Sequence, residues 1–199
     1  MSSEGASGTA SGGQLEERAD LSAETESKLA QSASLVQAGQ LREALALLAA
    51  LEKRCRVGND VDSLVKVCEA SLNHCKEVGD DEALVQTLQT LATRRSQKTK
   101  AVKALVSTAI PWCLKDQYSP IVVSNDAQKD SRDKLVVALR EITDGKIFLE
   151  TERARLTRAL ADIKVCIMNF IYRMVAQCVF GVPSQQSLTF YVFFAVTIG

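Results

Sequence analysis

The sequence predicts an all-α protein made of stacked antiparallel helical hairpins, and three observations lead to this fold class. Apolar side chains recur every three or four residues from about Leu21 onward, as they do on one face of a helix. Glycine and Asx residues interrupt that pattern at places where helices commonly end. The chain has only three prolines and few closely spaced turn signals, which argues against an all-β domain. With 46% apolar residues, the helices have enough material for a core.

Five helices are expected in the first part of the chain. Ser22 is a candidate cap for the first helix, and Asp60 or Asp62 opens the third. Gly79 and the two aspartates that follow it separate the third helix from the fourth. The expected helices span about residues 22–38, 41–58, 60–79, 81–91 and 102–116.

A weak internal repeat relates the second and fourth of these helices. Four residues in or near the second helix return 40 positions later, in or near the fourth. They are Gly39, Leu48, Leu51 and Arg54, which correspond to Gly79, Leu88, Leu91 and Arg94. A period near 40 with two helices in each unit is typical of an α-solenoid of the tetratricopeptide-like or HEAT-like kind.

The second part of the chain begins with an expected loop at residues 116–130. A helical pattern resumes at Ser131 and breaks at Asp144-Gly145, where glycine can adopt the positive φ of a tight break. The helix that follows has an apolar stripe opposite a charged face. The stripe consists of Leu149, Leu156, Leu160 and Ile163. This pattern predicts packing against other helices.

The charged face of that last helix carries acids and arginines three residues apart. Glu150 precedes Arg153, and Glu152 precedes Arg155, so we expect each pair to form an ion pair between adjacent turns. A solvated, ion-paired surface is favoured here over a catalytic carboxylate pair. The acids that such a pair could use are Glu141, Asp144, Glu150 and Glu152.

Composition divides the chain into three segments. Residues 1–20 are rich in Ser and Gly and are expected to be disordered, and residues 21–164 form the helical-repeat arm. Residues 165–199 form an atypical apolar tail with Arg173 as their single charge, and we expect a foreign ending such as an alternative splice product. A membrane anchor is the alternative, although polar residues within the run weaken the pattern of a spanning helix.

Charge and cysteine content limit the function classes. Lys plus Arg equals Asp plus Glu, at 24 each, so the whole chain has no excess charge that would favour nucleic acid. The N-terminus shows no charged region followed by an apolar core, so no secretory signal is expected. The six dispersed cysteines are therefore expected as free thiols in a reducing compartment.

No motif predicts an active site. Gly145-Lys146 lacks the upstream glycine and the following Ser or Thr of a phosphate-binding loop. A metal site could use His74 with Cys68 and Cys75, but no second Cys/His pair supplies the remaining ligands of zinc. We therefore expect His74 on a helix surface and the two cysteines in the core. The chain is expected to be no enzyme and to need no cofactor or metal.

The run Arg94-Arg95-Ser96-Gln97 allows two interpretations. It could be a kinase target or a basic patch. Alternatively, it is the end of a helix, where cations interact favourably with the helix dipole.

Two stretches resemble a known family: LATRRSQKTKAV at residues 91–102 and EITDGKIFLETERARLTRALADIK at residues 141–164. They are similar to the N-terminal half of the 26S proteasome non-ATPase regulatory subunit 12 family, which forms part of the regulatory-particle lid. Residues 37–56 fit an early helical hairpin of the same family more loosely. The resemblance covers about residues 20–164.

The resemblance implies a non-catalytic lid scaffold that supports ATP- and ubiquitin-dependent protein degradation in the cytoplasm and nucleus. Its implied partners are other lid subunits, with the core particle as a further candidate; nucleic acid, membranes and small-molecule substrates are not expected. The family's C-terminal winged-helix assembly domain has no counterpart after Lys164, so a truncated form is expected. The alternatives are a subunit of the related signalosome and a membrane-anchored helical adaptor. The candidate interaction or structural residues are Arg94, Arg95, Gln97, Gly145, Lys146, Glu150, Glu152, Arg153 and Arg155.

Overall fold

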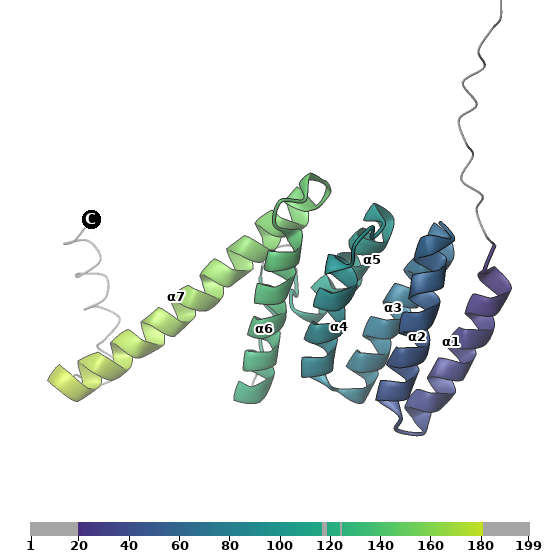
Figure 1. Cartoon of the computed structure of the whole chain (residues 1–199). Helices are drawn as coiled ribbons and strands as arrows, with labels where there is room; N and C mark the ends of the chain where they lie inside the picture. Colours follow the sequence, from purple (N-terminus) through teal and green to yellow (C-terminus); the bar gives the residue numbers. More distant parts are fainter. Residues whose placement is uncertain (1–19, 117–118, 124, 181–199) are drawn as a thin grey trace, which may run out of the picture.

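The protein is a row of antiparallel helices, shown by a computed structural model that describes residues 20–116, 119–123 and 125–180 (Figure 1). Over these residues the chain forms seven α-helices and two short 3-10 helices, η1 (Ile110–Trp112) and η2 (Ile147–Leu149), and no strand. The α-helices are α1 (Ser22–Gln37), α2 (Leu41–Val57), α3 (Val61–Val78), α4 (Asp81–Thr93), α5 (Thr99–Ala109), α6 (Asp126–Thr143) and α7 (Glu150–Phe180). The prediction of an all-α fold of stacked hairpins is confirmed.

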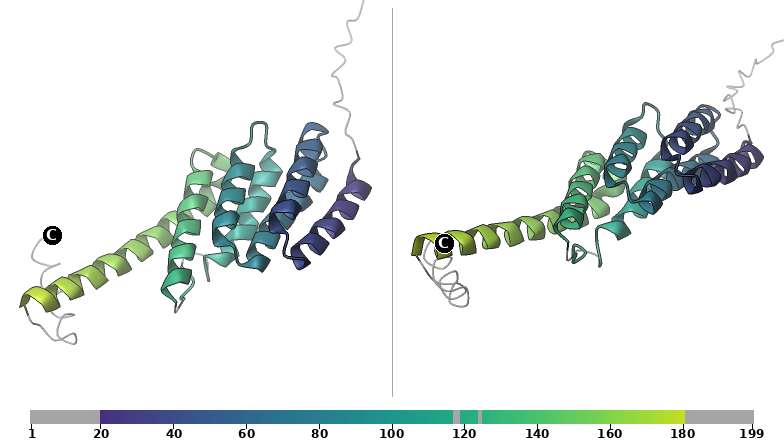
Figure 2. Two further views of the ribbon diagram at one scale, coloured as in Figure 1. Left: turned by 60° about the horizontal axis from the view of Figure 1, so that its bottom comes forward. Right: turned by 90° about the horizontal axis from the view of Figure 1, so that it is seen from below.

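The helices stack as they do in a solenoid, because each contacts near neighbours in the chain. α1 packs on α2, α2 on α3 and α3 on α4, and further contacts join α1 to α3, α3 to α5 and α4 to α6. Two views from other directions show the same row, with α7 running away from it (Figure 2). A fold of this kind buries its core only through the stacking of consecutive units.

The expected repeat corresponds to two equivalent hairpins, α1–α2 and α3–α4. Gly39 and Gly79 end the first helix of each hairpin, and both have a φ of +77°. A Cβ added at either glycine would meet nothing within 4 Å, so the backbone angle alone favours glycine. Leu48 and Leu88, which are 40 residues apart, are both completely buried.

One hydrophobic core extends from α2 to α7. Cys68 and Cys75 lie in it, fully buried, as predicted, and Cys55 and Cys113 lie there too. Burial disfavours the charged thiolate and raises the pKa of both Cys68 and Cys113 to about 12. Cys166 is exposed on α7. The buried thiols therefore act as small apolar side chains.

Two helix starts differ from the sequence prediction. α6 begins at Asp126 and not at Ser131, because the Asn125 side chain caps it by accepting a hydrogen bond from the Ala127 amide at 3.0 Å. The expected loop is correspondingly shorter. Ser22 is the first residue of α1 and not its cap; the carboxylate of Asp20 accepts a hydrogen bond from the Ser22 amide at 3.0 Å.

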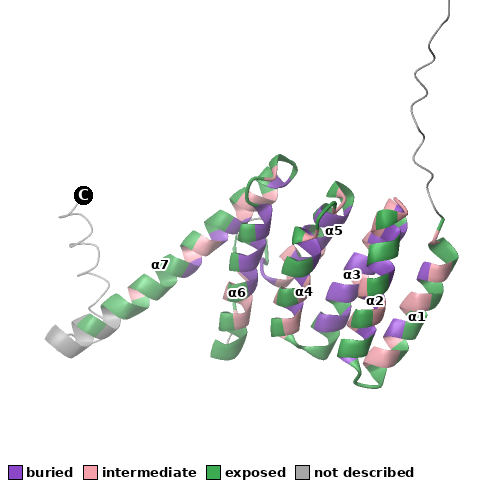
Figure 3. Ribbon diagram, in the orientation of Figure 1, coloured by how far each residue is buried: buried purple, intermediate pink, exposed green. Residues whose placement is uncertain are grey.

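α7 has two different halves. In the first half, the predicted stripe faces α6, with Leu149, Leu156 and Ile163 buried and Leu160 packed against the core. The helix then continues without a break past Lys164, and the side chains described beyond that residue are mostly exposed (Figure 3). Its exposed large apolar side chains are Val165, Ile167, Met168, Phe170, Ile171, Tyr172 and Val175.

The alternative of a membrane anchor concerns this part of the chain and the residues after it. Among the described residues, none of the helices combines the length and the apolar character that crossing a membrane requires. The apolar run at residues 188–199 lies outside the described residues, as does the Ser/Gly-rich segment up to residue 19.

Candidate interaction site

A buried carboxylate organises the segment that follows α4. Glu52 of α2 is completely buried. Its Oε1 accepts hydrogen bonds from the Arg56 Nε at 3.0 Å and from the Gln97 side-chain amide at 3.2 Å. The Arg94 Nε lies 3.5 Å from the other carboxylate oxygen. We call Glu52, Arg56, Arg94 and Gln97 the Glu52 clamp.

The backbone after α4 turns so that it can reach this carboxylate. α4 ends at Thr93, Arg94 is extended, and Ser96 has a φ of +61°, which is uncommon for a residue other than glycine. This turn directs the Gln97 side chain back toward α4, where it also donates to the Leu91 carbonyl at 2.8 Å. From α2, the Arg56 guanidinium donates to the Arg95 carbonyl at 2.9 Å. The clamp therefore joins α2 to the α4–α5 connection.

The charges of the clamp fit a structural role. A buried carboxylate is costly unless cations and hydrogen bonds compensate for its lost hydration, and here two arginines and an amide surround it. The second carboxylate oxygen of Glu52 and the Arg94 Nε have no hydrogen bond of good geometry, although they attract each other as ions. Acid–base chemistry is disfavoured for a carboxylate held in this way. Arg95 and Ser96 remain exposed at the surface.

Glu52 was not predicted as a functional residue, although its position in the sequence indicates that it is buried. Glu52 lies four residues after Leu48 and three before Cys55, so it occupies the apolar stripe of α2. A charged residue in such a stripe needs a partner. Arg94 and Gln97, which the sequence did single out, are those partners together with Arg56. α4 ends at Thr93, directly before Arg94, and both interpretations of Arg94-Arg95-Ser96-Gln97 stay predictions.

The second group of candidate residues lies at the joint between α6 and α7. Gly145 has a φ of +68°, as the predicted tight break requires. Lys146 donates from its ammonium to the Ile142 carbonyl near the end of α6. The Arg153 guanidinium is 2.7 Å from the Asp144 carboxylate, which links the first turns of α7 to the end of α6.

The ion pairs predicted within α7 are wrong. Arg153 pairs with Asp144 and not with Glu150, because the Gly145 turn places that carboxylate beside the start of α7. Within the described part of the chain, Glu150 and Glu152 form no ion pair, and the buried Nε of Arg155 has no hydrogen-bond partner. The structure thus places the nine candidate residues in two separate groups. One lies in the connection between α4 and α5, and the other lies at the α6–α7 joint.

His74 is a further correction. It was expected on a helix surface, but it is buried, because α1 covers this side of α3. Its Nε2 lies 3.0 Å from the Ser32 hydroxyl of α1, and its Nδ1 lies 3.6 Å from the Glu77 carboxylate. His74 therefore joins α1 to α3. Over the described residues, no three His, Cys, Asp or Glu side chains are grouped as a metal site would need.

The family model described as PSMD12/CSN4, N-terminal, matches residues 43–167, which include both groups of candidate residues. The 26S proteasome non-ATPase regulatory subunit 12 of Dictyostelium discoideum is 34% identical over 145 residues, which cover 73% of this chain and 30% of the relative. Homolog B of that subunit from Arabidopsis thaliana is 32% identical, over 63% of this chain and 26% of the relative.

A fission yeast protein extends this range of organisms. The 26S proteasome regulatory subunit rpn501 of Schizosaccharomyces pombe is 33% identical over 57% of this chain and 23% of the relative. The chain thus spans less than a third of the length of these relatives. The resemblance seen in residues 91–102 and 141–164 is confirmed, and the chain belongs to the PSMD12/CSN4 N-terminal domain family.

Proposed function

We propose that the chain is a non-catalytic scaffold subunit of the 26S proteasome regulatory lid. In this role it supports ATP- and ubiquitin-dependent protein degradation through contacts with other proteins. The observation that carries the proposal is the family match over residues 43–167, together with relatives that are named as proteasome regulatory subunits. The match extends from α2 into α7.

The fold supports a scaffold mechanism. The Glu52 clamp and the Asp144–Arg153 pair hold two joints of the row, and the core runs through α2 to α7. The arm can therefore present its exposed helix faces in a fixed order. Such a surface suits contacts with several neighbouring proteins at once.

The proposed partners are other lid subunits, with the core particle as a further candidate, and the proposed location is the cytoplasm and nucleus. The signalosome is the second candidate assembly, because the matching family takes its description from both PSMD12 and CSN4. The proteasome assignment comes from relatives that are much longer than this chain.

Affinity purification tests the proposal. The chain carrying an epitope tag is expressed at low level in its source cells, and co-purifying proteins are quantified by mass spectrometry, with imaging of the same tag for its location. We expect enrichment of proteasome lid subunits. Recovery of signalosome subunits without lid subunits would transfer the assignment to the second candidate, and recovery of neither would refute both.

Two variants of α2 test whether the ordered arm makes these contacts, one that changes the Glu52 clamp and a matched control that does not. Glu52→Ala removes the acceptor of the clamp from α2, whereas Glu43→Ala removes an exposed carboxylate from the same helix. If the ordered arm makes the contacts, Glu52→Ala reduces the yield of lid subunits and Glu43→Ala leaves it unchanged.

A further inference from the structure

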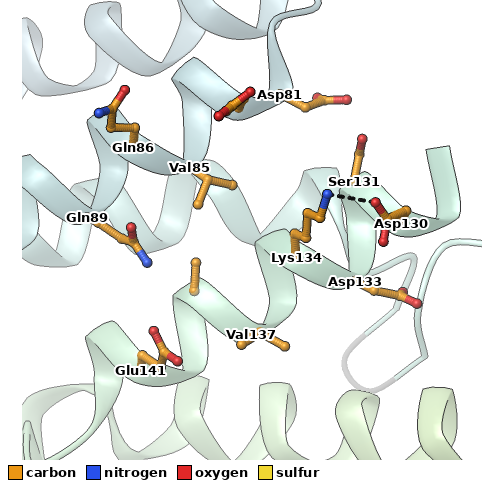
Figure 4. Close-up of a pocket in the computed structure, with 12 residues that line it drawn as sticks. Asp81, Val85, Gln86, Gln89, Asp130, Ser131, Asp133, Lys134, Val137 and Glu141 are labelled. Atoms are coloured by element: carbon orange, nitrogen blue, oxygen red, sulfur yellow. Dashed lines mark ion pairs between the residues drawn. The ribbon is translucent and has the colours of Figure 1, made fainter. Parts of the chain in front are cut away.

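An open groove lies between α4 and α6, outside both groups of candidate residues. Its volume is about 840 Å³, and its walls come from the N-terminal part of α4 and the middle of α6. Val85 and Gln89 point from α4 toward α6 (Figure 4). Val137 of α6 also lines the groove and is 40% exposed. The groove therefore offers apolar surface that the described chain leaves uncovered.

The polar residues around this surface are mainly acidic. Asp130 pairs with Lys134 at 2.7 Å, and Asp133 pairs with Arg132 at 2.6 Å, so these two carboxylates are compensated within α6. Glu82 and Glu141 also line the groove and are exposed, and neither forms an ion pair with another described residue. Five carboxylates and one ammonium, that of Lys134, line the groove, and Lys134 also interacts electrostatically with Glu82. The groove therefore keeps an excess of negative charge around the valines.

A second groove, between α2 and α4, serves as a comparison within the molecule. Its volume is about 180 Å³, and its lining includes Leu45, Ala49, Thr87 and Thr90 but no acid. Each groove lies between two helices that are separated by one helix in the chain, so the stacking alone produces a gap of this kind. Compared with the groove between α2 and α4, the groove between α4 and α6 is larger and has acidic edges.

We propose that the groove between α4 and α6 binds an amphipathic helix of a partner protein, with an apolar stripe bordered by lysine or arginine. The valines match the stripe, and Glu82 and Glu141 match the flanking cations by charge complementarity. The length also fits, since the lining of α6 from Asp130 to Glu141 extends for roughly 17 Å, which a helix of about 14 residues spans. The proposal rests on the scaffold function in that it names one contact surface of the arm.

A synthetic peptide probes this site in the full-length chain. The peptide has about 14 residues, with leucines at helical spacing and lysines on both sides of them, and its partner peptide has glutamate in place of lysine. Binding is measured by fluorescence anisotropy for the unaltered chain, for Glu82→Lys/Glu141→Lys and for Glu150→Lys. Glu150 is the matched control, because it is an exposed acid in the first turn of α7 as Glu82 is in α4.

We expect the lysine peptide to bind the unaltered chain and the Glu150→Lys variant equally. The double variant should bind it at least tenfold more weakly and should bind the glutamate peptide more tightly than the unaltered chain does. Raising the salt to about 0.5 M should weaken these contacts, because they are exposed. Circular dichroism establishes that the variants keep their helicity, as expected for residues without ion pairs.

Two results would overturn the proposal. The first is that the double variant binds the lysine peptide as tightly as the unaltered chain does. The second is that Glu150→Lys loses as much binding as the double variant, which would indicate unspecific attraction to acids. The assay contains no other subunit of the proposed assembly, so it tests this surface independently of assembly. Failure to co-purify with the lid would refute the proposed function while the groove could still bind the peptide.

Discussion

The middle of the row and its C-terminal end differ in how their helices are covered. α3 packs against α1, α2, α4 and α5, and Leu64, Val67 and Leu72 on it are completely buried. α7 packs on α6 only along its first half, and seven large apolar side chains beyond Lys164 are exposed. This difference shows that a helix in this fold is stabilised by packing against neighbouring helices on several sides. The second half of α7 relies on its own backbone hydrogen bonds.

Buried polar contacts show the same contrast. In the N-terminal part, the Asp60 carboxylate accepts hydrogen bonds from the amides of Leu21 at 3.0 Å and Ser63 at 3.3 Å, and so links the start of α1 to the start of α3. Glu52 and His74 make comparable links. At the α6–α7 joint, the Asp144–Arg153 pair is largely at the surface. The two parts should therefore respond differently to substitution.

The largest effect is expected in the middle of the row. Leu72→Ala opens a cavity at a fully buried site, and we expect it to lower the free energy of unfolding by about 2–5 kcal/mol. Ile171→Ala, on the exposed half of α7, is the matched control and should change it by less than about 0.5 kcal/mol. Urea unfolding followed by circular dichroism measures both. Equal losses would show that α7 is covered as α3 is.

A smaller but still large effect is expected at the Glu52 clamp. Glu52→Ala removes the hydrogen-bond acceptor of Arg56 and Gln97 and the ion-pair partner of Arg94. We expect a loss of about 2–3 kcal/mol, because these groups are only partly accessible to water. Asp144→Ala breaks the more exposed pair with Arg153 and should cost no more than about 1 kcal/mol. Thermal unfolding distinguishes the two, and a larger loss for Asp144→Ala would reverse the contrast.

The buried thiols predict a dependence on pH. The pKa of Cys68 rises from an ordinary value of 9.0 to about 12 in the folded protein. Well below pH 9 the Cys68 thiol is protonated in both the folded and the unfolded protein. Its contribution to the free energy of unfolding is therefore fully present there. Above pH 9 the unfolded thiol ionises first, and stability declines by roughly 1.4 kcal/mol per pH unit until the folded thiol also ionises.

Unfolding by urea at pH 8, 9 and 10 measures this slope, with Cys68→Ala as the comparison. The variant should be less stable at every pH because of its cavity, but its stability should fall less steeply above about pH 9. Cys166→Ala is the control, since Cys166 is exposed and its removal should leave the slope unchanged. A common slope for all three proteins would contradict the assignment.

The smallest change in stability is expected on the exposed second half of α7. Phe170→Glu places a charge on the exposed half of α7 and should alter the free energy of unfolding by less than about 0.5 kcal/mol. It should nevertheless reduce self-association, because exposed apolar patches promote it. Size-exclusion chromatography at increasing concentration tests this. Unchanged association would mean that other surfaces cause it.

The helices and their breaks could be predicted because they depend on local patterns. The apolar stripe of α7 and the glycines at 39, 79 and 145 have the predicted roles, since periodicity and positive φ act within a few residues. The start of α6 was placed too late, because Asn125 acts as a cap in a stretch that reads as a loop.

The contacts between distant residues could not be predicted in this way. Glu52 and Gln97 are 45 residues apart and meet only because α2 and α4 are stacked. His74 is buried because Ser32 and the rest of α1 cover it, which the sequence of α3 alone does not contain. Arg153 had two acids within reach, and the backbone turn at Gly145 selected Asp144. Tertiary approach, and not residue type, decided each of these pairs.

The length of α7 gives the molecule a lever. From Lys164 to Phe180 the helix advances by about 24 Å, and it is straight in all views (Figures 1 and 2). From its base at Glu150 to Phe180 the helix extends for about 45 Å, so a rotation of roughly 5° at the base would move the tip by about 4 Å. Arg153 and Lys146 fix the base to the end of α6, so a neighbour that shifts either contact would move the far end of α7 further than its base.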